Sequence, residues 1–195
     1  MNNYQKIFIT TISIFLLCMT GLFCQAQQDS ASLELFKKIA VELMNSRVQQ
    51  NVSSLEPGQM SPSFNFKDIN NKQVKLEDFK GKYVYIDVWA TWCAPCCVEI
   101  PLLQKLARKF RRKKIVFVSV SIDKDKKEWS QFVKKYNLEG VQLWTGGNIT
   151  WTDAYQITSI PRFILIDKEG RIVNAKMTRP SDPETEKTLS NLKGI

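Results

Sequence analysis

Three cysteines lie close together in the chain, at positions 93, 96 and 97. In a Cys-X-X-Cys pair the second sulfur lies one helical turn after the first, so the two can close into a disulfide and open again. The other two cysteines, Cys18 and Cys24, lie in a separate apolar stretch at the N-terminus. The cysteines are therefore clustered for chemistry rather than distributed to cross-link a fold.

Cys93 and Cys96 lie where a predicted strand gives way to a predicted helix. The run Tyr83–Ala90 is nearly all apolar, as in a strand buried on both faces, and Ala94–Arg112 has the pattern of a helix interrupted by Pro101. The unpaired N–H groups at a helix N-terminus stabilise a thiolate and lower its pKa from about 8.5 to roughly 3.5–7.5. We therefore predict that Cys93 attacks and that Cys96 resolves the mixed disulfide.

The absence of histidine narrows the chemistry that these cysteines can perform. Zinc sites that use histidine, Cys–His and Ser–His–Asp catalytic groups, and haem attachment through Cys-X-X-Cys-His all require it. A zinc site made of cysteines alone would need two further ligands, and the sequence has no second Cys-X-X-Cys pair. We expect thiol redox chemistry with no metal and no cofactor.

The chain is basic, with 28 lysines and arginines against 19 aspartates and glutamates and a formal charge of +9. The densest basic run, Lys105–Lys114, contains Leu106 and Phe110 at helical spacing. We interpret this run as the solvated end of a helix, where cations complement the helix dipole. No nucleic-acid-binding motif accompanies it, so we expect no nucleic-acid partner.

The first 26 residues have the layout of an export signal. Lys6 precedes the apolar run Ile7–Phe23, and Cys24-Gln25-Ala26 ends on a small residue, as at a signal-peptidase site. We expect cleavage after Ala26. Two alternatives stay open: lipidation of Cys24, and retention of the apolar run as a membrane anchor, although it is short for a full span. Each alternative places the working domain in the periplasm or cell envelope.

The rest of the chain divides into a short extension and one larger domain. Residues 27–56 are predicted to form a helical extension, because apolar residues in Ser30–Gln50 recur at helical spacing before Ser54–Pro62 breaks the pattern. Residues 57–195 alternate strand and helix patterns, which predicts an α/β sandwich with a mixed central sheet. The other predicted strands are 63–69, 73–76, 115–122, 162–167 and 171–176, and the other predicted helices are 126–136, 151–155 and 183–192.

The residues around the cysteines resemble a known family. Asp87–Cys96 (DVWATWCAPC) is similar to the active-site strand and loop of thioredoxin, and Trp92–Pro101 fits the WCxPCxxExP pattern of the TlpA/ResA-like branch. The resemblance extends from about Pro57 to the C-terminus. It implies a thioredoxin-like three-layer sandwich, with helices on both faces of the sheet, and the activity of an exported thiol–disulfide oxidoreductase.

The resemblance also implies roles for individual residues. Cys93 matches the attacking cysteine and Cys96 the resolving cysteine. Pro161 matches a cis-proline that faces the disulfide and presents its backbone to an extended substrate. The residues predicted to bind substrate are Trp92, Ala94, Pro95, Ile160 and Pro161.

Two carboxylates complete the predicted catalytic set. Asp87 matches the buried thioredoxin carboxylate, where desolvation would raise its pKa and allow it to take the proton of Cys96 near neutral pH. Many TlpA-like relatives have asparagine there, and a solvated strand-end aspartate is the alternative. Glu99 matches an acidic residue that tunes the ResA-like site, with an exposed helix glutamate as the alternative. Cys97 departs from both patterns, and we expect it to fill space, with a regulatory disulfide as the alternative.

The predicted function is dithiol–disulfide exchange with cysteine-containing envelope proteins, and the uncharged Ala94-Pro95 pair favours a reductant. An upstream membrane thiol reductant would regenerate the pair, and family roles include cytochrome c maturation. The membrane itself would be contacted only through an N-terminal anchor or lipid. The alternatives are a peroxiredoxin-like thiol peroxidase, whose motif proline is absent before Thr91, and a non-enzymatic domain that binds a metal or a partner.

Overall fold

The computed structural model describes residues 34–35, 37–42 and 55–195, and the chain divides into two units, residues 1–51 and 52–195. In the first unit the described residues are helical, and they lie within the predicted helix Ser30–Gln50. The rest of that helix and the predicted signal segment lie outside the described residues. Within the described ranges, no helix is both long enough and apolar enough to cross a membrane.

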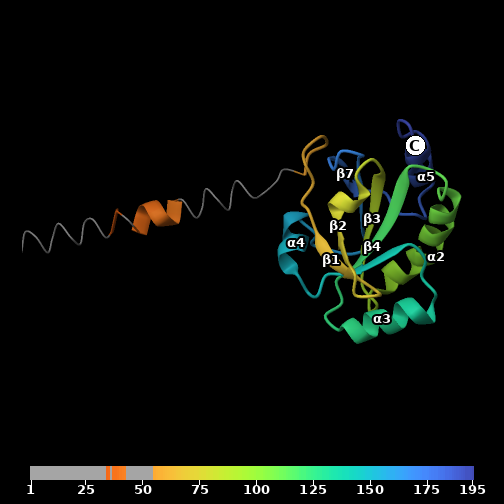
Figure 1. Cartoon of the computed structure of the whole chain (residues 1–195), viewed down its shortest axis with the longest axis horizontal. Helices are drawn as coiled ribbons and strands as arrows, with labels where there is room; N and C mark the ends of the chain where they lie inside the picture. The colour runs from red at the N-terminus through yellow and green to blue at the C-terminus, as the bar shows by residue number, and fades with distance from the viewer. Residues whose placement is uncertain (1–33, 36, 43–54) are drawn as a thin grey trace, which may run out of the picture. The chain divides into compact units, whose positions relative to one another are not determined.

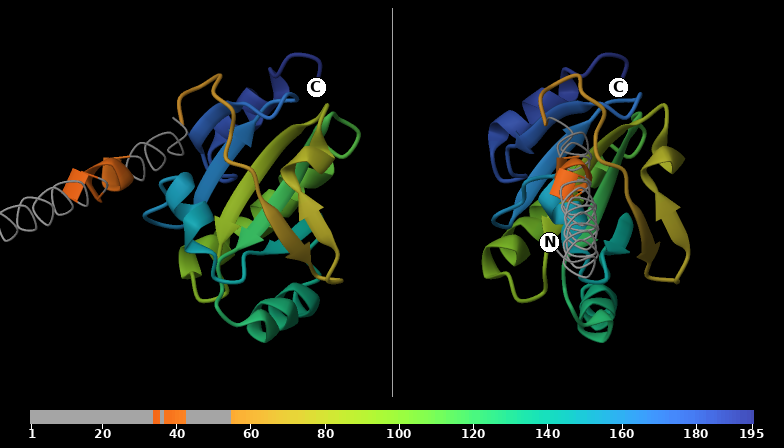
Figure 2. Two further views of the ribbon diagram at one scale, coloured as in Figure 1. Left: turned by 60° about the vertical axis from the view of Figure 1, so that its left-hand side comes forward. Right: turned by 90° about the vertical axis from the view of Figure 1, so that its left-hand side faces the viewer.

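One mixed sheet of seven strands organises the second unit (Figure 1). Its strands are β1 (Asn65–Asp68), β2 (Gln73–Lys75), β3 (Tyr83–Trp89), β4 (Ile115–Ser121), β5 (Val141–Trp144), β6 (Arg162–Ile166) and β7 (Ile172–Met177). They lie side by side in the order β2-β1-β5-β4-β3-β6-β7. Strands β3, β4 and β5 are parallel and the other pairs are antiparallel, which confirms the predicted mixed sheet. Figure 2 shows the twist of the sheet.

Helices cover both faces of this sheet. They are α2 (Ala94–Lys109), α3 (Lys126–Lys135), α4 (Ile149–Ala154) and α5 (Pro183–Ser190), with a 3-10 turn, η1 (Leu76–Phe79). Figure 1 shows α4 on one side of the sheet and α2 and α5 on the other. Neighbouring residues of β3 face opposite sides: Ile86 packs in the cluster of Trp151 from α4, whereas Tyr85 packs with Leu103 of α2 and Leu189 of α5. This alternation gives the three predicted layers.

Strand β5 is an element that the sequence did not predict. It has four residues and contains the polar Gln142, so its periodic signal is weak. Turn residues bound it, with Gly140 before it and Gly146-Gly147 after it, all with positive φ. Strand β5 pairs with both β4 and β1, so it joins the β1–β2 hairpin to the rest of the sheet, and α3 makes the crossover from β4 to β5.

Helix α2 continues through Pro101 and ends at Lys109, three residues before its predicted end. Arg108 and Lys109 lie in its last turn, and the basic residues that follow are exposed. The interpretation of this basic run as the solvated end of a helix is therefore confirmed.

Three segments that are distant in the sequence meet at one end of strand β3. Trp89, its last residue, lies opposite Ser121, the last residue of the parallel strand β4. Val88 lies opposite Arg162, the first residue of the antiparallel strand β6. Three segments therefore lie at the same end of these strands: the turn that carries Cys93, the loop after β4 and the segment that leads into β6.

Candidate active site

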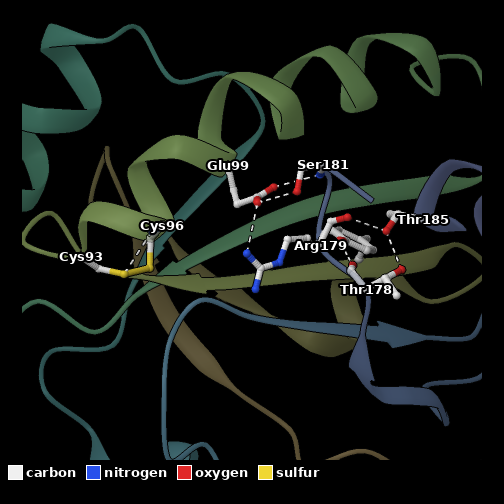
Figure 3. A network of polar contacts seen from close by, with 8 residues as sticks. Cys93, Cys96, Glu99, Thr178, Arg179, Ser181 and Thr185 are labelled. Carbon is white, nitrogen blue, oxygen red and sulfur yellow. Dashed lines mark hydrogen bonds and ion pairs between the residues drawn. A yellow bond between two sulfur atoms is a disulfide. The ribbon is translucent and has the colours of Figure 1, made fainter. Parts of the chain in front are cut away.

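Cys93 and Cys96 form a disulfide at the start of α2, as the sequence predicted (Figure 3). Their Cα atoms lie 5.2 Å apart. Cys93 is the N-cap residue of the helix, and its Sγ accepts a hydrogen bond of 3.3 Å from the backbone N–H of Cys96. Only 5% of Cys93 and 2% of Cys96 is exposed. The backbone N–H of Cys96, at the N-terminus of α2, therefore faces the Cys93 sulfur, where it would stabilise a thiolate after reduction.

The turn before the disulfide is held by a buried carboxylate that sequence reasoning missed. Asp123, in the loop after β4, is only 1% exposed. It accepts hydrogen bonds from the backbone N–H of Thr91 at 3.1 Å and from the Thr91 hydroxyl at 2.8 Å. Ser121 donates a third hydrogen bond to it at 2.7 Å. The position of Asp123, directly after a buried strand next to β3, was the signal that could have identified it.

Cys97 does not take part in the disulfide and is the free cysteine of the part of the chain that the structure describes. It is half-buried, and its Sγ lies 3.7 Å from the carbonyl oxygen of Thr91, to which it donates a hydrogen bond. Burial raises the pKa of the Cys97 thiol, and the nearby Asp123 carboxylate raises it further. Both effects keep Cys97 protonated beside the redox pair, which agrees with the role of a bystander.

The predicted substrate-binding residues lie around the disulfide. The Ile160–Pro161 peptide bond is cis, as predicted, and Ile160 packs against the cluster that contains both cysteines. Ala94 and Pro95 are exposed in the first turn of α2. Trp92 is 66% exposed. It lines an open hollow of about 460 Å³ together with the apolar Ile122 and Ile149, among other residues. Their roles in binding stay predictions.

Asp87 is buried in the middle of β3, on the strand that leads to the disulfide. Burial raises the pKa of Asp87 from 3.8 to about 7, and the charge of Glu99 adds to this rise, whereas a hydrogen bond from Ser119 opposes it. The alternative of a solvated strand-end aspartate is therefore wrong. A carboxyl group of this kind can exchange a proton with a thiol near neutral pH.

Glu99 is also buried, so the alternative of an exposed helix glutamate is wrong. Figure 3 shows its carboxylate turned toward the loop before α5. There it accepts hydrogen bonds from the Ser181 backbone N–H at 2.9 Å and from the Ser181 hydroxyl at 2.7 Å. The guanidinium of Arg179 lies 3.8 Å away. Sequence reasoning missed Ser181 and Arg179, because contacts across about 80 residues leave no local pattern.

Comparisons with known proteins agree with this geometry. A family model described as Redoxin matches residues 56–193. The chain is 32% identical over 139 residues to the thiol-disulfide oxidoreductase ResA of Bacillus thuringiensis subsp. konkukian, which covers 71% of this chain and 79% of that protein. The solution structure of a candidate thiol-disulfide oxidoreductase of Bacteroides vulgatus is 54% identical, with a TM-score of 0.65 over 72% of this chain and 93% of that one. The thioredoxin domain of a thiol-disulfide oxidoreductase from the same organism is 31% identical, with a TM-score of 0.64 over 70% and 97%.

The fold, the disulfide and these matches together define a thiol–disulfide oxidoreductase with a thioredoxin-like fold. More narrowly, the chain belongs to the Redoxin family and is a ResA/TlpA-like member of the thioredoxin superfamily.

Proposed function

We propose that this protein reduces disulfides in cysteine-containing proteins of the cell envelope. The observation that carries the proposal is the Cys93–Cys96 disulfide at the N-terminus of α2, beside the cis-peptide of Pro161. An extended polypeptide bound against Pro161 would bring its own disulfide to Cys93. The exposed indole of Trp92 would contact apolar residues on one side of that disulfide.

The reaction proceeds in two exchanges. The Cys93 thiolate attacks one sulfur of the substrate disulfide, so a mixed disulfide forms and the first substrate thiolate leaves. Cys96 then gives its proton to Asp87, and its thiolate attacks the Cys93 sulfur. The Cys93–Cys96 bond forms, the second substrate thiolate leaves, and both substrate thiolates take protons from solvent. Two electrons pass from the protein to the substrate, and the protein ends in the oxidised form that the structure contains.

The location and partners follow from the N-terminal sequence and the exchange chemistry. The predicted export signal at residues 1–26 supports a periplasmic or envelope site, with attachment to the membrane only through an anchor or a lipid. A membrane protein that delivers thiol electrons would reduce the Cys93–Cys96 disulfide after each turnover. Apocytochrome c is one candidate substrate, because its two haem-binding cysteines must be reduced before haem attaches.

Trapping tests the substrate class. Replacement Cys96→Ser leaves Cys93 able to attack but removes the thiol that releases the substrate, so mixed disulfides should accumulate in an envelope extract. The same extract treated with Cys93→Ser/Cys96→Ser should yield none, and Cys96→Ser/Cys97→Ser should trap as many proteins as Cys96→Ser alone. Recovery of no protein disulfide with the trapping variant would contradict the proposal.

The direction of electron transfer, from the protein to its substrate, is tested separately by reduction of insulin disulfides. The reduced protein should accelerate this reduction, and Cys93→Ser should return the rate to that of the reductant alone. Cys97→Ser should retain the wild-type rate, because Cys97 lies outside the disulfide.

A further inference from the structure

A row of polar side chains crosses the middle of the sheet beside the active site. Asp87 on β3 lies opposite Ser119 on β4, and Ser119 lies opposite Gln142 on β5. All three residues are buried, with 4%, 7% and 6% of their surfaces exposed. Buried polar groups require hydrogen-bond partners, so three in adjacent strands call for a physical explanation.

The row lines a small cavity of about 20 Å³ between the sheet and α2. This volume is enough to hold one water molecule. Two residues of its lining carry a buried polar atom that has no hydrogen-bond partner among the described residues: Trp89, whose Nε1 is a donor, and Gln142, whose Oε1 is an acceptor. The amide of Gln142 has a defined orientation, because its Nε2 donates to the carbonyl oxygen of Glu139 at 2.9 Å. Its oxygen therefore remains for another donor.

The cavity also connects the buried carboxyl group with the surface. Asp87 lines it together with Gln104 and Glu139. Gln104 is partly exposed, and the Glu139 side chain is 53% exposed. A single molecule in the cavity would thus lie between a buried acid and groups in contact with solvent.

We propose that this cavity binds one water molecule, held by Trp89 and Gln142, and that this water carries protons between Asp87 and solvent beside Glu139. The inference rests on the proposed function, in which Asp87 accepts the proton of Cys96. It adds a route by which that proton reaches solvent.

The proton balance of the relay is simple. When Cys96 attacks Cys93, the proton of Cys96 moves to a carboxylate oxygen of Asp87. Asp87 then gives this proton to the cavity water, which passes one of its own protons outward to solvent and is left unchanged. Asp87 is again a carboxylate, ready for the next turnover, and the substrate thiolates take their protons from bulk water.

The bound water can be detected directly in the wild-type protein. In ¹⁵N-tryptophan-labelled protein, the Nε1–H of Trp89 should show a nuclear Overhauser contact with a long-lived water. A Trp89 indole that shows no such contact would overturn the proposal, whatever the activity of the protein.

The relay itself is tested by the pH dependence of disulfide reduction over many turnovers, with a chemical reductant regenerating the cysteine pair, because Asp87 must lose its proton before it can act again. Gln142→Leu removes the acceptor, and Ser119→Ala removes the hydrogen bond that lowers the pKa of Asp87. Each variant should move the midpoint of the pH profile upward by about one unit and lower the rate at pH 7 about fivefold. Gln142→Leu should also abolish the water contact of Trp89.

Leu143→Val is the matched control, because Leu143 is the next residue of β5 and packs on the opposite face of the sheet. This variant perturbs the same strand but should keep the wild-type midpoint. Equal midpoints in Gln142→Leu and Leu143→Val would overturn the relay while the proposed function stands. A wild-type protein that reduces no disulfide at any pH would instead overturn the proposed function.

Discussion

Three buried carboxylates lie near the disulfide, and two of them, Glu99 and Asp87, have sharply different surroundings. Glu99 accepts two hydrogen bonds from Ser181 and faces the guanidinium of Arg179, so its negative charge is compensated by donors. No ion pair of Asp87 occurs among the described residues, and burial raises its pKa to about 7. Burial alone therefore does not decide what a carboxylate does. Ser181 and Arg179 make Glu99 suited to joining helix α2 to the loop before α5. Asp87 lacks such partners and is therefore suited to proton transfer.

The largest expected effect is on stability, from the replacement Asp87→Asn. The acid has a pKa of 3.8 when exposed and about 7 in the folded protein. Folding favours the protonated form of Asp87, so ionisation of Asp87 destabilises the folded protein. This loss of stability is absent below pH 4, grows as the pH rises toward 7, and then stays constant. Three pH units correspond to about 4 kcal/mol.

Urea unfolding of the oxidised proteins measures this effect. Asp87→Asn should exceed the wild type in free energy of unfolding by up to about 4 kcal/mol at pH 8, and the difference should shrink toward zero at pH 4. A difference that does not change with pH would show that Asp87 ionises as an ordinary aspartate.

The next effect is on the rate of the second exchange. Asp87→Asn removes the base that takes the proton of Cys96, so the rate of mixed-disulfide resolution at pH 7 should fall about 100-fold. Stopped-flow measurements across pH should show an inflection near 7 in the wild type and none in the variant. Persistence of the inflection in Asp87→Asn would assign it to another group.

A smaller effect is expected at Glu99. The replacement Glu99→Gln sets an amide against the two donors of Ser181, which should lower the free energy of unfolding by about 1–3 kcal/mol at pH 7. The exposed Glu184, which pairs with Lys187 on α5, provides the control: Glu184→Gln should cost less than about 0.5 kcal/mol. Equal losses in free energy of unfolding in Glu99→Gln and Glu184→Gln would show that the buried hydrogen bonds of Glu99 stabilise the fold no more than an exposed ion pair does.

The smallest effect is expected at Arg179. Its side chain is 58% exposed and lies 3.8 Å from the Glu99 carboxylate, so the attraction is screened by solvent. Arg179→Gln should lower the free energy of unfolding by less than about 0.5 kcal/mol, and 1 M salt should remove the difference. A loss as large as that of Glu99→Gln would show that the cation, rather than Ser181, compensates the glutamate.

The sequence was sufficient to predict the parts of the site that are formed by residues close together in the chain. The apolar run of β3, the Cys-X-X-Cys spacing and the helix after it are consecutive in the chain, so their patterns predicted the disulfide at a helix N-terminus. The resemblance supplied the cis-proline, Pro161, which is far away in the sequence. The resemblance to thioredoxin also supplied the burial of Asp87.

The remaining features depend on contacts that no local pattern records. Strand β5 is too short for a periodic signal. The position of Gln142 beside Ser119 depends on the pairing of β5 with β4, which no local pattern predicts. The bonds of Glu99 to Ser181 form only when α2 and the loop before α5 pack on the same face of the sheet. Asp123 reaches Thr91 because the ends of two parallel strands meet at one edge.

A redox titration of the cysteine pair tests the central claim most directly. In thiol–disulfide buffers, alkylation of free thiols should reveal one two-electron transition with a potential between about −270 and −120 mV, and Cys96→Ser should abolish it. A potential below about −300 mV, as in structural disulfides, would contradict the account, because the bond would then hold the fold together rather than exchange with substrates.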